Sequence, residues 1–162
     1  MERAPVTKIL LSLHVLAAIV AIGPVTVAAS MFPPAARRAV PAGGDAADPS
    51  AVSTVALLHR ICRVYAGIGL TVPLFGFATG AAMGVLGSGW LVTSIALTAA
   101  AAGILVAFVL PRQEELLGRL RGEQAVEHRN TVQLAMFTGI FNLLWATVTV
   151  LMIVRPGSTT GA

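Results

Sequence analysis

Charged side chains are scarce in this 162-residue chain, because Asp, Glu, Lys and Arg together make up 11% of it. A soluble globular domain contains about 25% of these residues. Hydrophobic residues make up 56% of the chain, and the mean hydropathy is +0.84. Too little polar surface remains to cover a water-soluble globule, which excludes a cytosolic enzyme, a disordered tail and a small secreted domain. The composition predicts an integral membrane protein.

Several kinds of functional motif are missing as well. A single cysteine, Cys62, excludes an intrachain disulfide and a paired-cysteine metal or redox motif. There is no glycine loop followed by the lysine and hydroxyl that a phosphate site needs. The few acidic residues lie in polar segments, so no Ser–His–acid set can be assembled. The basic residues, which give a net charge of +4, form no aromatic-studded face for nucleic acid. These absences favour a non-enzymatic protein.

Four apolar runs are long enough to cross a bilayer, which needs about 20 residues of helix. None of them contains Asp, Glu or Lys. We therefore expect an all-α, integral membrane four-helix bundle that forms a single domain over residues 1–162. The expected spans are residues 9–32, 61–86, 90–110 and 131–154, and the expected loops are residues 33–60 and 111–130.

The second loop is expected to hold a short interfacial helix on the cytoplasmic side. Leu116, Leu117 and Leu120 share one helical face there, and Glu115 lies four residues before Arg119, a spacing that favours an ion pair. Upstream, Ser50 is a predicted N-cap for the second span, and a tight turn over residues 87–89 joins the second and third spans into a hairpin.

The distribution of Lys and Arg predicts the orientation of the spans. The two expected loops and their helix mouths hold eight of these residues, and the other side holds three, namely Arg3, Lys8 and Arg155. Basic loops stay in the cytoplasm, so we expect a multi-pass plasma membrane protein with both termini outside. Small residues at 27–29 resemble a signal-peptide cleavage site, but the apolar run before them exceeds the usual length. We expect this run to be retained.

Small residues recur every fourth position in two spans and predict close helix packing. The first stripe is Gly76, Gly80 and Gly84, and the second is Ala99, Gly103 and Ala107. Because a hairpin would make these spans neighbours, we expect the two stripes to meet. Prolines at 24 and 73 should kink their helices, and an oligomeric small-solute transporter is an alternative that rests on these two positions alone.

Histidines are the residues most suited to holding a cofactor. His14 lies about 9 Å along the first span, at 1.5 Å per residue, where its imidazole could bind haem iron. Donation to a carbonyl or a threonine of a neighbouring helix is the other interpretation. His59 and His128, with Glu127 nearby, could instead form a metal site in the cytoplasmic region. A haem with two histidine ligands would need a second chain, because these two histidines lie across the membrane from His14.

The chain resembles a family of small bacterial four-span membrane proteins, domain-of-unknown-function family 2269. The similar segments are Leu13–Ala18 with Gly23, Pro73 with Thr79–Gly80, and Met152–Pro156. This resemblance implies a four-helix membrane fold and no established activity.

A looser similarity links the chain to copper-resistance proteins and haem-associated membrane proteins, which also open with a Leu–His pair. The tryptophan–glycine–glycine stretch expected after that histidine is replaced here by residues 21–24, and the third span has no lysine. Both departures weaken a haem interpretation.

The sequence thus favours an accessory or scaffolding protein of the lipid bilayer that packs against itself or against a larger membrane complex. It is expected to need no cofactor. The alternative is a haem- or metal-binding redox protein that uses His14.

Overall fold

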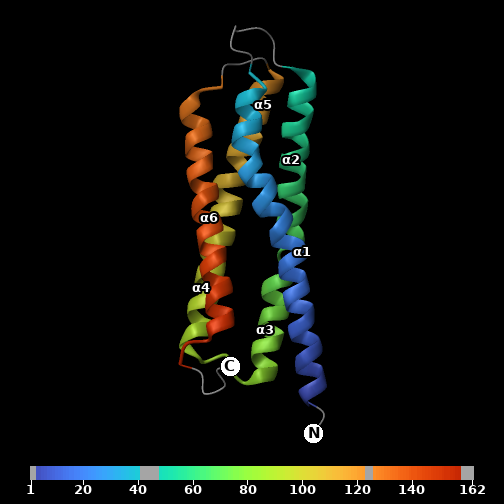
Figure 1. Ribbon diagram of the computed structural model, residues 1–162, viewed down its shortest axis with the longest axis vertical. Coiled ribbons are helices and arrows are strands. Elements are labelled where there is room, and N and C mark those ends of the chain that lie inside the picture. Colours follow the sequence, from blue (N-terminus) through green and yellow to red (C-terminus); the bar gives the residue numbers. More distant parts are fainter. Residues whose placement is uncertain (1–2, 41–47, 123–125, 158–162) are drawn as a thin grey trace.

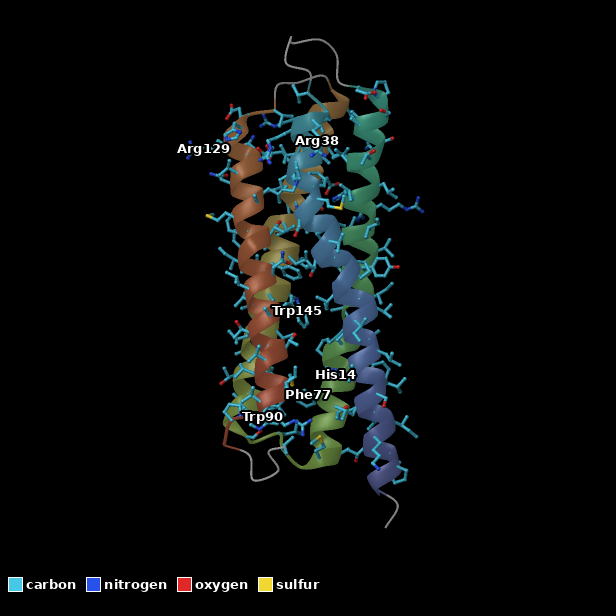
Figure 2. All side chains as sticks on the ribbon, in the orientation of Figure 1. His14, Arg38, Phe77, Trp90, Arg129 and Trp145 are labelled. Atoms are coloured by element: carbon cyan, nitrogen blue, oxygen red, sulfur yellow. The ribbon has the colours of Figure 1, made fainter. Side chains whose placement is uncertain are left out.

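The computed structural model describes residues 3–40, 48–122 and 126–157 of the chain, and every regular element in these ranges is helical. Four long helical stretches lie side by side and alternate in direction (Figure 1). We call the end of the bundle that carries Arg38 and Arg129 the basic end, and the end that carries the turn over residues 84–88 the hairpin end (Figure 2). All four stretches are long and apolar enough to cross a membrane. The expected all-α, multi-pass membrane fold is confirmed.

Helix α1 (Arg3–Arg38) is one continuous helix that includes Pro24, Pro33 and Pro34. The prediction that an irregular loop begins at residue 33 is wrong for residues 33–38. Tertiary packing explains the difference, because Phe32 and Ala36 are completely buried on either side of the two prolines. The missing proline N–H groups weaken local hydrogen bonding, but burial of this last turn against the other helices keeps it helical.

The second stretch consists of α2 (Pro49–Ile68) and α3 (Thr71–Met83). The two helices are separated at residues 69–70, close to Pro73, which cannot donate a backbone hydrogen bond to the preceding turn. This interruption agrees with the expected effect of that proline.

The start of α2 is capped by Asp48, not by Ser50 as predicted. Pro49 occupies the first turn, where a proline is pre-organised for the helix, and the Asp48 carboxylate accepts hydrogen bonds from the Ser50 hydroxyl at 2.8 Å and the Ser50 backbone N–H at 3.0 Å. The Ser50 side-chain hydrogen bond, followed by the backbone one, holds the pKa of Asp48 below its usual value. The cap is therefore formed at neutral pH, and it weakens as the pH falls through that lowered pKa.

The third stretch runs without interruption from the hairpin end to the basic end. It consists of α4 (Gly89–Ile104), the π-helical turn η1 (Leu105–Val109) and α5 (Leu110–Arg121). The expected separate interfacial helix is instead this continuous extension. In η1 the N–H of Leu110 donates to the carbonyl of Leu105, five residues back, and this wider turn lies immediately before Pro111.

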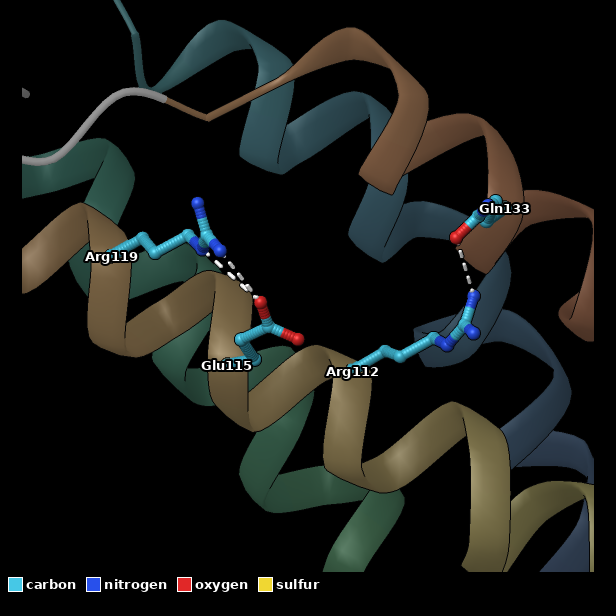
Figure 3. Close-up of polar contacts among 4 residues, drawn as sticks. All are labelled: Arg112, Glu115, Arg119 and Gln133. Atoms are coloured by element: carbon cyan, nitrogen blue, oxygen red, sulfur yellow. Dashed lines mark hydrogen bonds and ion pairs between the residues drawn. The ribbon is translucent and has the colours of Figure 1, made fainter.

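The face predicted for α5 is the one that is buried. Leu116, Leu117 and Leu120 are at most 5% exposed, and Arg119 pairs with Glu115 at 2.9 Å (Figure 3). This face packs against α2, so the helix is part of the bundle and does not lie separately on the membrane surface. Burial of the three leucines explains why the third span continues past Pro111.

The fourth stretch is α6 (His128–Val154), which ends at Arg155 in the left-handed conformation. Its contacts are chiefly with α4 and α1. Helix α1 in turn contacts α2, α3, α5 and α6.

The main apolar core lies between mid-height and the basic end. Phe32 of α1, Val55 of α2, Leu116 of α5 and Leu134 of α6 are at most 1% exposed and belong to one cluster. Helices α2 and α5 are amphipathic, whereas the others are apolar on most sides. In the hairpin half, α3 packs mainly on α1, and α4 packs mainly on α6. The two halves are therefore held together differently.

Replacement of the most central core side chain should test this arrangement. We expect Phe32→Ala to lower the free energy of unfolding by about 3 kcal/mol, because it leaves a cavity in a packed core. The neighbouring Met31→Ala removes a side chain that is 54% exposed and should change stability far less. Thermal unfolding of both variants in the same detergent would measure the difference, and equal losses would place the core elsewhere.

Candidate functional site

His14 lies in the seam between α1 and α3 in the hairpin half (Figure 2). Its Nδ1 donates a hydrogen bond of 2.9 Å to the backbone carbonyl of Val72. The ring also rests against Gly76, where an added Cβ would lie 2.9 Å from Cε1 of His14. Donation to a carbonyl of a neighbouring helix is one of the two roles expected for this histidine.

The same hydrogen bond has a consequence for ligand binding. With Nδ1 acting as donor, neutral imidazole keeps its lone pair on Nε2, which is how histidine ligands to metals are commonly oriented. His59 and His128 belong to α2 and α6 in the basic half of the bundle, far from His14 along the helices. Within one chain, His14 could therefore supply one ligand to a haem and neither of the other histidines could supply the second.

His59 takes part in a buried polar contact between α2 and α5. Its Nδ1 donates to Oε1 of Gln113 at 3.2 Å, and Nε2 of Gln113 donates to Sγ of Cys62 at 3.5 Å. Gln113 and Cys62 are completely buried. This chain of contacts links the two amphipathic helices, and no local pattern predicts it, because Gln113 lies 54 residues from His59 and 51 residues from Cys62.

The proposed metal group of His59, His128 and Glu127 is not assembled. Glu127 and His128 lie at the start of α6, whereas His59 is held by α5 through Gln113. Among residues 3–40, 48–122 and 126–157, no group of three or more His, Cys, Asp or Glu side chains is placed to hold a metal ion. The geometry thus gives the metal interpretation no support.

Arg112 is fixed where the third stretch passes from apolar to charged sequence. Its Nη1 donates to Oε1 of Gln133 at 2.9 Å (Figure 3), and its guanidinium lies 4.6 Å from the centroid of the Phe137 ring. Phe137 stacks on Phe108 at 4.8 Å. Gln133 of α6 therefore binds an arginine of the neighbouring stretch.

A stripe of polar side chains lies near the middle of α6. Nδ2 of Asn142 donates to Oγ of Ser30 in α1 at 3.1 Å, as expected for an asparagine at a helix interface. Oγ1 of Thr138, Oδ1 of Asn142 and Nε1 of Trp145 are buried and have no hydrogen-bond partner in the described part of the chain. The spacing of these three residues places them on one face of the helix.

The two small-residue stripes do not meet as expected. Gly76 faces His14 of α1, and a Cβ on Gly80 would approach Leu86 and Leu91 at the hairpin turn. Gly84 ends α3 with a φ of 71°, a conformation that favours glycine. α3 therefore packs on α1 through Gly76, and its contact with α4 is slight.

The second stripe faces away from the bundle. Ala99, Gly103 and Ala107 are exposed, and a Cβ built on Gly103 meets no atom within 4 Å. The buried face of α4 is formed by other residues, among them Leu91, Ser94 and Ala101. A packing role for this stripe thus requires a helix from another molecule.

Comparison with models of protein families, with curated proteins and with solved structures finds no match to this chain. The geometry of the chain's own residues is therefore what supports a function. Two features are the strongest candidates: the outward stripe on α4 and the His14 seam.

The His14–Gly76 contact can be tested by a double-mutant cycle. We expect Gly76→Ala to destabilise the protein by about 1–2 kcal/mol, since overpacking of a tight contact outweighs the gain in helix propensity. In a His14→Ala background the penalty should vanish, because the ring that the new methyl group meets is gone.

The matched control is Gly139→Ala in α6, where a Cβ meets no atom within 4 Å. This variant should be neutral or slightly stabilising. Thermal unfolding in detergent measures the wild type, the two single variants, the double variant and the control. A Gly76→Ala penalty that persists without His14 would contradict the contact.

Proposed function

We propose that this chain is a non-enzymatic, multi-pass membrane protein that acts as an accessory or scaffolding component. It packs through the outer face of α4 against a second copy of itself or against another membrane protein. The observation that carries this proposal is the exposure of Ala99, Gly103 and Ala107. These residues form one line along α4, and no other part of the described chain covers that line.

The physical argument rests on what drives helices together in lipid. Lipid tails are as apolar as leucine, so association depends on close packing and hydrogen bonds. A line of alanine and glycine lets two backbones approach closely, and Gly103 leaves the open space for this approach. Large apolar side chains that are exposed elsewhere on the bundle can be covered by lipid alone. A line of small side chains, in contrast, favours close contact with another helix.

The proposed setting is the bacterial plasma membrane, with the basic end in the cytoplasm. Arg38 and Arg129 lie at that end (Figure 2), together with Arg121 at the end of α5 and most of the other arginines of the described chain. Positively charged segments stay on the cytoplasmic side, which would place both termini outside. Membership of domain-of-unknown-function family 2269 is part of the same proposal and rests on the short segments quoted above.

Association through α4 predicts a specific defect. We expect Gly103→Leu to reduce self-association or the amount of a co-purifying membrane protein by at least about tenfold, because a bulky side chain prevents close helix approach. The measurement is cross-linking in native membranes, followed by sedimentation and mass analysis in mild detergent.

Gly139→Leu is the matched control, since it adds the same side chain to an open position on α6. It should leave association unchanged. A wild-type protein that is a monodisperse monomer with no protein partner would overturn the proposal, and so would equal losses in the two variants.

The second candidate function is haem binding through His14, and the hydrogen bond from Nδ1 to Val72 favours it because Nε2 then remains free to act as a ligand. A haem would supply electron-transfer chemistry. If two histidine ligands are needed, the other would be His14 of a second chain.

An absorption spectrum of the purified protein separates the two candidates. Haem binding predicts a Soret band that is lost in His14→Ala and retained in His128→Ala. The scaffolding proposal predicts a colourless preparation. A band that survives His14→Ala would remove this residue as the ligand.

A further inference from the structure

A groove of about 900 Å³ lies between α2 and α5 on the side of the bundle toward the basic end. This volume is within the range of small-molecule sites. Arg60 and Arg63 of α2 and Arg121 of α5 line it, and His59 contributes to its wall. The one acidic side chain in the lining is Glu114. Three guanidinium groups against one carboxylate give the groove a positive charge.

The arginines of the groove differ from those on the other side of α5. Arg119 is bound to Glu115, and Arg112 is bound to Gln133. In the part of the chain that the structure describes, Arg60, Arg63 and Arg121 make no hydrogen bond or ion pair with another side chain. Their donors are therefore available to an anion.

The groove is also apolar along the side of α2. Leu57 is 57% exposed and Val64 is 51% exposed, and both line it. Ile68 continues this exposed line one turn beyond Val64, toward the hairpin end. Arg63 is the last charged residue of α2, so the groove spans the level at which the chain passes from charged to apolar sequence. Arginines in the groove, followed by exposed apolar side chains beyond Arg63 toward the hairpin end, suit an amphiphile that is aligned with the bilayer.

We propose that the groove between α2 and α5 binds an anionic phospholipid of the leaflet at the basic end. Arg60, Arg63 and Arg121 hold the headgroup phosphate, because guanidinium groups bind phosphate oxygens through charge-assisted hydrogen bonds. The acyl chain lies along Val64 and Ile68. Basic pockets between membrane helices are suited to such headgroups.

Gly118 provides a steric test of the site that leaves its charges intact. It lines the groove, and a Cβ built on it meets no atom within 4 Å. Gly118→Leu should fill the groove without a clash in the bundle, and it exchanges glycine for a better helix former. The variant should fold and fail to bind the lipid.

The experiment titrates the full-length protein in detergent with phosphatidylglycerol and with phosphatidylcholine, and measures binding by native mass spectrometry and by the shift in thermal unfolding. The wild-type protein should prefer phosphatidylglycerol. The triple variant Arg60→Gln, Arg63→Gln, Arg121→Gln should weaken phosphatidylglycerol binding by about tenfold or more, and Gly118→Leu should do the same.

The control for overall charge is the triple variant Arg37→Gln, Arg38→Gln, Arg129→Gln, which removes three exposed arginines of the same region outside the groove. It should retain the preference for phosphatidylglycerol. Equal losses in the two triple variants would show general surface attraction and overturn the proposal.

Two further results would also overturn it. If inorganic phosphate stabilised the protein as much as phosphatidylglycerol does, the groove would be a soluble-anion site. If Gly118→Leu bound phosphatidylglycerol normally, the lipid would bind elsewhere.

Discussion

Close packing around α1 is the interaction on which the rest of this bundle depends. Water is not available to drive apolar surfaces together inside a bilayer, so the helices hold to one another where their side chains fit closely. Several of the buried side chains of α1 are small, among them Ala28, Ala29 and Ala36. The helix contacts α2, α3, α5 and α6. Loss of the first span by cleavage near residues 27–29 would divide this helix in the middle of its buried face.

The bundle combines two kinds of packing along one axis. Toward the basic end, amphipathic α2 and α5 bury leucines and Gln113, whose Oε1 and Nε2 each have a hydrogen-bond partner, much as helices of a soluble protein do. Toward the hairpin end, the helices associate in pairs, α3 with α1 and α4 with α6. Gly76 and His14, in place of a common apolar core, make a close contact between α1 and α3 there. The two halves of the bundle are therefore stabilised by different kinds of contact between helices.

The sequence was sufficient for the four-span, all-α architecture because hydropathy and length constrain a membrane chain strongly. The four spans, the buried face of Leu116, Leu117 and Leu120 and the Glu115–Arg119 pair all follow from local patterns. Contacts between distant residues did not follow, because no spacing rule relates Gln113 to His59 or Gln133 to Arg112. The stripe on α4 was recognised, but its direction was not, since a hairpin turn does not specify which faces of its two helices meet.

The π-helical turn at Leu105–Val109 sets the rotational phase of everything that follows it in the third stretch. An α-helix advances by about 100° per residue, so a chain one residue shorter at this turn would present α5 to its neighbours rotated by about that angle. The leucines would turn away from α2, and charged side chains would turn toward it. The number of residues between the apolar α4 and the charged α5 is therefore as constrained as their identity. The π-helical turn accommodates the extra residue, so that α4 and α5 can each present their buried face to the bundle.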